Sequence, residues 1–390
     1  MNEMSDKVCM VVYSYYPRDQ RVRKEAEALQ RNGFDVSVIC LRQKDESKDE
    51  TVRGVRVHRL ALQTAREGNA LRYAYQYLLF FLLATAVLTS LHLKERFRVV
   101  HLHSLPDFIV FAAFLPKMLG AKIVLDLHEG MPEIYVGKMK AKPNGAVYNI
   151  IAFIEKVSAS YADEVITVSD LIKELMVGRG LDGTKLDVIY NVPDFEGFVK
   201  HRKSVNNKLV YAGTLNEFQD FDTVISALAK MPDIELDIYG DGSLSTDIKL
   251  KVAEEKLEHV VFHGWISPIE LRSVLPSYAG AIIPFVDNEI TRIALGHKAL
   301  ESSMLGLAVV AVDLPGLRRM FDDSCFYYYR ANDPESLWKA IAALLSDEGK
   351  AAMKVDNSQK AMIEKGLTWS KVEEKLVRIY RDLLRNTDVG

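Results

Sequence analysis

The stretch GHKALESSMLGLAVVAVDLPG, residues 296–316, decides the fold, because it joins a helix to a buried strand and places two charged residues where the helix starts. Upstream, residues 279–285 read AGAIIPF, a short apolar run that is typical of a buried strand. Leu300, Met304 and Leu305 then recur at helical spacing until a glycine ends the helix, and AVVAV predicts the next strand. Strand, helix and strand in this order predict a parallel α/β unit.

Lys298 and Glu301 therefore lie in the first turn of a helix that follows the carboxyl end of a strand. In doubly wound sheets this is the edge where ligands bind, and a helix amino terminus with a nearby lysine suits a diphosphate. One interpretation of the two residues is a nucleotide-sugar site. The other is a surface ion pair one turn apart, which stabilises a helix by only about 0.2–0.5 kcal/mol.

The composition is ordinary for a globular protein with room for more than one domain. The chain has 390 residues, of which 48% are hydrophobic and 26% are charged. A formal net charge of -3 gives no basic field for nucleic acid, so any anion site must be local. Cys9, Cys40 and Cys325 form no CxxC or Cys/His cluster, which argues against a disulfide framework and structural zinc. We expect a cytoplasmic protein, and the first residues lack a signal-peptide pattern.

One apolar segment challenges that expectation. Residues 73–91 carry no charge and are about long enough to cross a bilayer as a helix. However, predicted strands at residues 55–60 and 99–103 flank the segment, and a span would put strands of one sheet on opposite sides of a membrane. The alternatives are a helix buried in the domain, or a helix lying on a membrane surface with the basic residues between Arg72 and Arg98 near lipid headgroups.

Strands and helices alternate along the chain, which predicts two parallel sheets. Predicted strands lie at residues 7–13, 35–41, 55–60, 99–103, 122–128, 164–169 and 185–191, and then at residues 208–215, 234–240, 259–264, 279–285, 308–312 and 325–329. We therefore predict an α/β protein of two Rossmann-like, doubly wound domains, residues 1–192 and 208–368, joined by a polar linker at 193–207. An amphipathic helix follows at residues 369–390 and is a candidate for packing back on the first domain.

Several motifs in order carry a resemblance to a known family. They are YPRDQRVRKEAEALQRNGFDVSVI, HLHSLPD, VLDLHEGMPE, VSDLIKELM and YNVPD, followed by YAGTL, YGDGS and KALESSMLGLAVVAVDLPGLR. Together they resemble the GT-B glycosyltransferases, and within them the retaining enzymes of glycosyltransferase family 4. The resemblance implies two facing Rossmann-like domains with a deep interdomain cleft. It also implies a metal-independent sugar transfer from a nucleotide-diphosphate-sugar, without a cofactor.

The resemblance implies roles for residues of the second domain. Lys298 would stabilise the leaving diphosphate as a catalytic residue, and Glu301 would accept hydrogen bonds from ribose hydroxyls. The other donor-binding candidates are Thr214, Gln219, Gly240, Asp241, Gly242, His263, Gly264, Ile266 and His297. The glycines at 240 and 242 would let the backbone approach the ligand closely, although a tight turn would need glycine as well. The residues from 263 to 266 would border the base.

In the first domain, the resemblance places a catalytic histidine at His128, beside the transferred sugar and the diphosphate. The alternative is a structural histidine at a strand end. His101 and His103 alternate on one strand and share a face, which raises the question of a metal, but no third ligand is evident and we predict none. The acceptor-binding candidates are Tyr16, Arg18, Asp19, Arg21, His103 and Asp107. The first four lie in the loop after the first strand, where a solvated charged loop is equally consistent.

Three departures from the family pattern keep a second function open. Ile293 replaces the first glutamate of a Glu-x7-Glu motif, Thr214 and the Gln219–Asp220 pair replace the usual cations, and His297 replaces an asparagine. The first hypothesis is a transferase that acts on a lipid-linked or saccharide acceptor in cell-surface polysaccharide or glycolipid biosynthesis, peripheral on the inner face of the cell membrane. The second is a catalytically degenerate GT-B-shaped binding or scaffold protein. Epimerisation or phosphorolysis on the same fold is a third.

Overall fold

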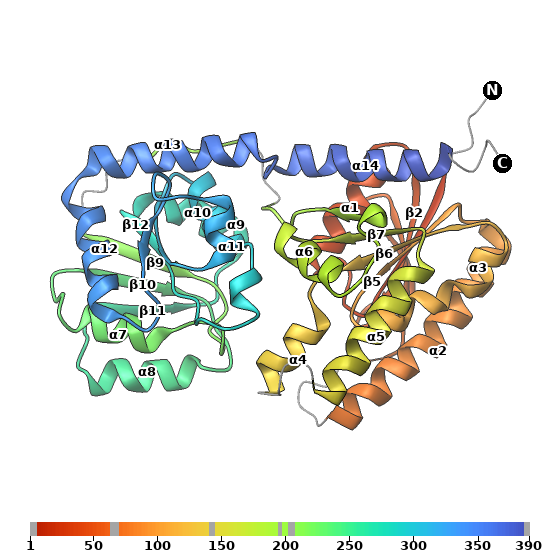
Figure 1. Ribbon diagram of the computed structural model, residues 1–390, viewed down its shortest axis with the longest axis horizontal. Coiled ribbons are helices and arrows are strands. Elements are labelled where there is room, and N and C mark those ends of the chain that lie inside the picture. Colours follow the sequence, from red (N-terminus) through yellow and green to blue (C-terminus); the bar gives the residue numbers. More distant parts are fainter. Residues whose placement is uncertain (1–5, 63–69, 140–144, 194–196, 202–206, 386–390) are drawn as a thin grey trace. The chain divides into compact units, whose positions relative to one another are not determined.

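The computed structural model describes the chain except residues 1–5, 63–69, 140–144, 194–196, 202–206 and 386–390. It divides into two compact units (Figure 1). The N-terminal unit comprises Met1–Asn191 with Ser370–Gly390, and the C-terminal unit comprises Val192–Trp369. Each unit is a sheet of mostly parallel strands with helices on both faces, which confirms the predicted α/β class and its two Rossmann-like domains.

The sheet of the N-terminal unit contains eight strands. They are β1 (Lys7–Val12), β2 (Asp35–Leu41), β3 (Asp49–Val52), β4 (Val55–Leu60), β5 (Val99–His103), β6 (Lys122–Leu127), β7 (Glu164–Thr167) and β8 (Leu186–Val188). The strand order is β3-β4-β2-β1-β5-β6-β7-β8, and only the β3/β4 hairpin at the edge is antiparallel. The sequence did not predict β3, because its residues DETV are mostly exposed and show no apolar run. The order reverses between β1 and β5, which defines the topological switch point.

The helices of this unit lie on both faces of the sheet. They are α1 (Gln20–Arg31), α2 (Ala70–Glu95), η1 (Asp107–Ala113), α3 (Phe114–Met118), α4 (Met131–Met139), α5 (Ala146–Tyr161), α6 (Asp170–Gly178), η2 (Gly183–Lys185) and α14 (Trp369–Arg385). The carboxylate of Asp19 caps α1 by accepting a hydrogen bond from the backbone N–H of Val22 at 3.2 Å. Helix α1 therefore begins inside the predicted loop, and Arg21 belongs to the helix instead of to a solvated loop.

Helix α2 is the apolar segment whose place was open. Among the described residues it is the one helix long and apolar enough to cross a membrane, by length and composition. It joins β4 to β5, which are strands of the same sheet. A membrane span would place these two strands on opposite sides of the bilayer, which is incompatible with that sheet. Only 22% of its most apolar window is buried, which also argues against the buried core helix. A helix exposed on the surface of the unit is the arrangement that the structure shows.

The final helix, α14, packs on the N-terminal unit. Glu373 accepts hydrogen bonds from Arg31 at 2.7 Å and from Asn32 at 2.9 Å. The ring of Tyr380 packs edge-on against Phe34, with 5.7 Å between centroids. These contacts join the end of the chain to α1 and to the start of β2.

The sheet of the C-terminal unit contains six parallel strands. They are β9 (Lys208–Ala212), β10 (Glu235–Tyr239), β11 (Val260–Gly264), β12 (Gly280–Ile283), β13 (Ala308–Val312) and β14 (Tyr327–Tyr329). The helices are α7 (Phe221–Leu228), α8 (Ser245–Glu254), α9 (Pro268–Val274), η3 (Leu275–Ser277), η4 (Thr291–Ile293), α10 (His297–Met304), α11 (Pro315–Met320), α12 (Pro334–Ser346) and α13 (Glu348–Glu364). The order β11-β10-β9-β12-β13-β14 reverses between β9 and β12, where doubly wound sheets bind ligands.

Two predicted glycines pack backbone against backbone beside this switch point. A Cβ on Gly240 would lie 1.8 Å from the carbonyl oxygen of Gly213, and a Cβ on Gly242 would lie 2.2 Å from that of Leu215. The backbone N–H of Gly213 also donates to the backbone carbonyl of Tyr239 at 2.9 Å. The loops after β9 and β10 therefore need glycine for their own packing, as the tight-turn alternative proposed.

Replacing Gly240 by alanine should test this close contact. The residue has φ +142°, so the substitution adds backbone strain to the clash, and we expect a loss of about 2–4 kcal/mol. The matched control is Gly264→Ala, because Gly264 has φ +71° and no described atom within 4 Å of its would-be Cβ. The control should cost only about 1–2 kcal/mol. Thermal unfolding midpoints measure both, and equal shifts would contradict the contact.

Candidate active site

The loops after β9 and β12 are tied together at the switch point of the C-terminal unit. The backbone N–H of Asp220 donates to the carbonyl of Pro284 at 2.6 Å, and that of Val286 donates to Phe218 at 3.0 Å. The second loop leads to Gly296, whose φ of +74° turns the chain into α10. The fold thus places the amino terminus of α10 at the carboxyl edge where a diphosphate would be expected.

Lys298 and Glu301 form an ion pair at the start of α10. Nζ of Lys298 lies 2.7 Å from Oε2 of Glu301. The lysine side chain is 39% exposed and the glutamate side chain only 7%. The ion pair of the simpler interpretation is therefore present, but its carboxylate is buried, unlike that of an ordinary surface pair. A ligand phosphate could compete for the ammonium group from the exposed side.

The other donor-binding candidates surround the same edge of the sheet. Thr214 is exposed, and its carbonyl accepts a hydrogen bond from Tyr211 at 2.7 Å. The Gln219 side chain accepts from the backbone N–H of Asn216 at 3.2 Å. His297, the first residue of α10, is half-buried. Thr214 and Gln219 lie on the loop after β9, and His297 lies on the helix that follows the loop after β12.

Asp220 has a structural role that the sequence did not suggest. It is 8% exposed, and its Oδ1 accepts a hydrogen bond from the backbone N–H of Thr223 at 3.0 Å, which caps α7. Its negative charge thus compensates the positive end of a helix. The contacts of Asp220 are therefore explained by the capping of α7, and not by an interaction with a diphosphate.

The candidates after β10 and at the end of β11 form a second group. Asp241 is exposed, and hydrogen bonds from the Ser245 hydroxyl and the Gly242 N–H lower its pKa. Nε2 of His263 lies 3.0 Å from Asp237, and its ring stacks on Tyr239 with 4.5 Å between centroids. The remaining two, Gly264 and Ile266, follow directly, and Ile266 packs against the buried core. A stacked, half-exposed ring at this edge is suited to bordering a planar base.

In the N-terminal unit, His128 follows the carboxyl end of β6. Its Nε2 lies 2.9 Å from Oδ2 of Asp126, and its side chain is 22% exposed. Asp126 is fully buried, and Arg21 donates to both of its oxygens, at 2.8 and 2.9 Å. Nδ1 of His103 lies 3.2 Å from the same carboxylate. His128 is therefore the partly exposed end of a buried polar cluster.

Four of the acceptor-binding candidates are buried, which corrects the expectation that they contact an acceptor directly. Tyr16 and His103 are 0% exposed, Asp107 is 4% exposed and Arg21 is 6% exposed. Arg21 uses its guanidinium on Asp126 and on the carbonyl of Ile189. Burial, reinforced by the charge of a nearby glutamate, raises the pKa of Asp107 to about 8. Asp19 is the cap of α1, and Arg18 is exposed.

The sequence also missed two carboxylates beside the histidine pair. Glu25, His101, His103 and Asp126 each place one potential ligand atom within 4.8 Å of the others. Arg21, however, lies 3.2 Å from Glu25 and donates to both oxygens of Asp126. The arginine therefore already supplies these two carboxylates with the positive charge that a metal ion would bring. The signals in the sequence were an acid two residues before His128 and an acid one helical turn after Arg21.

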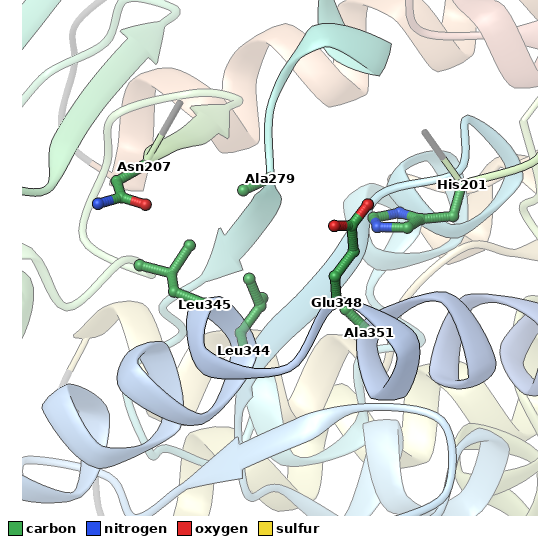
Figure 2. A pocket seen from close by; sticks show the side chains of 7 residues that line it. All are labelled: His201, Asn207, Ala279, Leu344, Leu345, Glu348 and Ala351. Carbon is green, nitrogen blue, oxygen red and sulfur yellow. The ribbon is translucent and has the colours of Figure 1, made fainter. Parts of the chain in front are cut away.

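A small cavity lies at the other edge of the C-terminal sheet (Figure 2). It measures about 70 Å³, and its lining residues are His201, Asn207, Ala279, Leu344, Leu345, Glu348 and Ala351. Asn207 precedes β9 and Ala279 precedes β12, so the cavity lies at the amino ends of the strands. It is therefore separate from the carboxyl edge that carries Lys298 and Glu301.

Comparison with known proteins assigns both halves of the chain. Residues 19–192 match the family described as Glycosyl transferase 4-like domain, and residues 206–347 match Glycosyl transferases group 1. The alpha-maltose-1-phosphate synthase of Mycolicibacterium smegmatis is 24% identical over 330 residues, which cover 76% of this chain and 82% of that relative.

Solved structures share the fold. Sucrose-phosphate synthase from Thermosynechococcus elongatus has a TM-score of 0.80 at 17% identity, over 98% of this chain and 100% of that chain. HepE of Anabaena in complex with UDP-glucose has a TM-score of 0.70 at 14% identity, over 96% and 99%. The domain matches and the fold show that this protein is a glycosyltransferase. More particularly, the chain belongs to the GT-B glycosyltransferases and resembles glycosyltransferase family 4.

The capping role of Asp220 leads to a prediction on stability. Asp220→Ala should lower the free energy of unfolding by about 1 kcal/mol, because the first turn of α7 loses its acceptor. Asp220→Asn should lose much less, since asparagine caps helices about as well as aspartate. Urea unfolding of the two variants measures the difference. An asparagine variant as unstable as the alanine variant would show that the charge matters more than the cap.

Proposed function

We propose that this glycosyltransferase binds a nucleotide-diphosphate-sugar at the carboxyl edge of the C-terminal sheet. The observation that carries the proposal is the Lys298–Glu301 pair at the amino terminus of α10, beside the switch point. The leaving diphosphate would take the ammonium of Lys298 from Glu301, and the freed carboxylate would accept hydrogen bonds from ribose hydroxyls. Helix N–H groups would add further donors to the phosphates.

The same proposal includes retention of anomeric configuration and independence from metal and cofactors. The resemblance to family 4 supports retention, because in such enzymes the leaving phosphate itself takes the proton of the acceptor hydroxyl. Positioned cations and N–H donors can stabilise the departing charge without a metal. His128, partly exposed at the end of β6, would donate to the transferred sugar or the diphosphate.

We also propose that the acceptor is lipid-linked or a saccharide, in cell-surface polysaccharide or glycolipid biosynthesis, and that the enzyme is peripheral on the inner face of the cell membrane. Crossovers from β4 to β5, from β5 to β6 and from β6 to β7 all run in one direction along the sheet, so α2, α3 and α5 cover the same face. Helix η1 packs against both α2 and α5.

This face of the N-terminal unit is unusually apolar. Its exposed side chains are Tyr73, Tyr75, Leu78, Leu82, Leu83 and Leu93 of α2, Phe114 and Met118 of α3, and Val147, Ile150, Phe153 and Val157 of α5. We call this set the apolar face. Leu82 is 56% exposed and Phe153 is 67% exposed. Large apolar side chains gathered on one exposed face are typical of an interaction site.

The charges beside the apolar face favour an anionic lipid surface. The one acid of α2, Glu95, binds Lys7 and Arg56, and the one acid of α5, Glu155, is fully buried. Helix α3 contains no acid. Exposed cations lie on or next to these helices, namely Lys94 in α2, Arg96 just after α2 and Lys156 in α5. Basic groups at the edge of an apolar helix face attract anionic headgroups.

Nucleotide binding tests the donor site. UDP, GDP, ADP, TDP and CDP are titrated against the wild type while thermal stability and heat are measured. One of them should stabilise the wild type by RT ln(1 + [L]/Kd). Lys298→Ala and Glu301→Ala should each raise the Kd for that nucleotide by about tenfold or more. The control is Lys339→Ala, which removes a lysine paired to Glu335 at 2.7 Å on α12.

Equal effects of the Lys298 and Lys339 variants would contradict the site. A folded wild type that binds none of the five nucleotides would favour the catalytically degenerate scaffold.

Vesicle binding tests the membrane proposal. The wild type should sediment with vesicles of phosphatidylcholine and phosphatidylglycerol, and less with phosphatidylcholine alone. Leu82→Ser with Phe153→Ser should weaken binding by roughly tenfold or more, because two large apolar side chains lose their burial in lipid. Ile363→Ser is the control, since Ile363 is 58% exposed on α13 of the other unit. A wild type that ignores vesicles but dimerises through the apolar face would overturn the proposal.

A further inference from the structure

A buried polar cluster stands behind His128. The groups that face it come from four elements: Arg21 and Glu25 of α1, His101 and His103 of β5, Asp126 of β6 and Tyr380 of α14. All six are at most 6% exposed. Charged and titratable groups are costly to bury unless they are paired. Their arrangement therefore calls for an explanation beyond packing.

Asp126 is the centre of the cluster. Its Oδ2 lies 2.8 Å from Nε of Arg21, 2.9 Å from Nε2 of His128 and 3.2 Å from Nδ1 of His103, while its Oδ1 lies 2.9 Å from Nη2 of Arg21. The carboxylate is thus held from three sides. Four contacts from three side chains leave it little freedom to rotate.

Arg21 anchors that carboxylate in the fold. Its two bonds to Asp126 form the planar fork that arginine makes with a carboxylate. Its Nη1 donates to the carbonyl of Ile189 at 2.9 Å, just after β8. The guanidinium is thereby fixed between α1, β6 and the end of the sheet, and it is too deeply buried to meet a substrate.

The contact with Asp126 distinguishes the two nitrogens of His128. Nε2 faces the buried carboxylate at 2.9 Å and also lies 3.2 Å from Nδ1 of His103. The side chain nevertheless stays 22% exposed. A carboxylate that accepts from one ring nitrogen selects the tautomer with the proton on that nitrogen. The other nitrogen, Nδ1, is left for a ligand.

We propose that Asp126, anchored by Arg21, is a positioning residue that holds the Nε2–H of His128 inward and thereby presents Nδ1 to the substrate. The inference rests on the proposed function in one respect, which is that the substrate places a sugar hydroxyl or a phosphate oxygen beside Nδ1. The neutral ring would accept from the hydroxyl there, and the charged ring would donate to the phosphate oxygen. The tautomer and the orientation of the ring follow from the contacts within the N-terminal unit alone.

The same contacts control the charge of His128. Burial opposes the charged imidazole, but the Asp126 carboxylate outweighs it and raises the pKa of His128. The pKa of Asp126 lies well below its usual range, because Arg21 and His128 together overcome the effect of burial. His128 therefore keeps its proton to a higher pH than a free imidazole does. Its Nδ1–H can then donate to an anionic oxygen, and this ability is lost as the pH rises through the raised pKa.

The last helix of the chain contributes to this setting. The Tyr380 hydroxyl lies 2.7 Å from Nδ1 of His101, whose ring is 4.1 Å from that of His103. Burial and the neighbouring His103 lower the pKa of His101 well below its usual range. A neutral His101 adds no positive charge that would compete with His128 for Asp126. Helix α14 thus contributes one buried group, the Tyr380 hydroxyl, to the cluster.

Nitrogen NMR of the full chain labelled with 15N-histidine tests the proposal without any substrate. In the wild type above its pKa, the His128 signals should show the proton on Nε2. In Asp126→Asn, the pKa of His128 should fall by about one pH unit or more, because the negative partner is gone. The control is Glu155→Gln, which disturbs another buried pair of the same unit, with Arg179 at 2.8 and 3.0 Å, far along the chain from His128.

The outcomes are distinct. A wild type with the proton on Nδ1 would overturn the proposal even if Asp126→Asn failed to fold. An unchanged pKa in folded Asp126→Asn, or an equal change in Glu155→Gln, would also overturn it. Nucleotide titration of the same samples reports separately on the donor site. A wild type that binds no nucleotide but shows the proton on Nε2 would refute the proposed function and leave the positioning role intact.

Discussion

The right-handed crossover between parallel strands is the constraint on which the rest of this protein depends. Each crossover returns the chain to the same edge of its sheet, so the loops after β9 and β12 meet at one switch point and deliver Lys298 to it. In the N-terminal unit the same rule sends His128 to the carboxyl edge. It also places α2, α3 and α5 on one face, so the exposed apolar side chains of three separated segments lie on the same side of the sheet.

Two ion pairs are buried in the N-terminal unit. Arg21 with Asp126, and Arg179 with Glu155, are buried ion pairs, and such pairs contribute little net stability because both ions lose their water. Asp126 differs from Glu155 in having a partly exposed histidine as a further partner. The cost of burying the first pair is better explained by the orientation of His128 than by stability. Lys298 and Glu301 repeat the pattern, with a buried carboxylate under an accessible cation.

Much of the fold could be predicted from short-range patterns. The apolar runs of the parallel strands identified both sheets. Such strands are buried on both faces, so each one shows as a run of apolar residues in the sequence, even when its neighbour in the sheet is unknown. The exposed residues of β3 lacked that signal and were missed. For the candidate site, the sequence located Lys298 and Glu301 at a helix start but left Gly240 ambiguous. The structure adds that Gly240 packs closely against the backbone of Gly213, and no local pattern encodes that contact.

The sequence by itself therefore determined the two-sheet architecture, the helix start that carries Lys298 and the exclusion of a global basic field, since these follow from composition and local periodicity. The tertiary structure alone decided which polar residues are buried. Arg21 meets Asp126 across 105 positions, and Tyr380 meets His101 across 279. It also decided that α2 is exposed. Contacts between residues so far apart arise only when the strands are ordered in a sheet, so no window of sequence contains them.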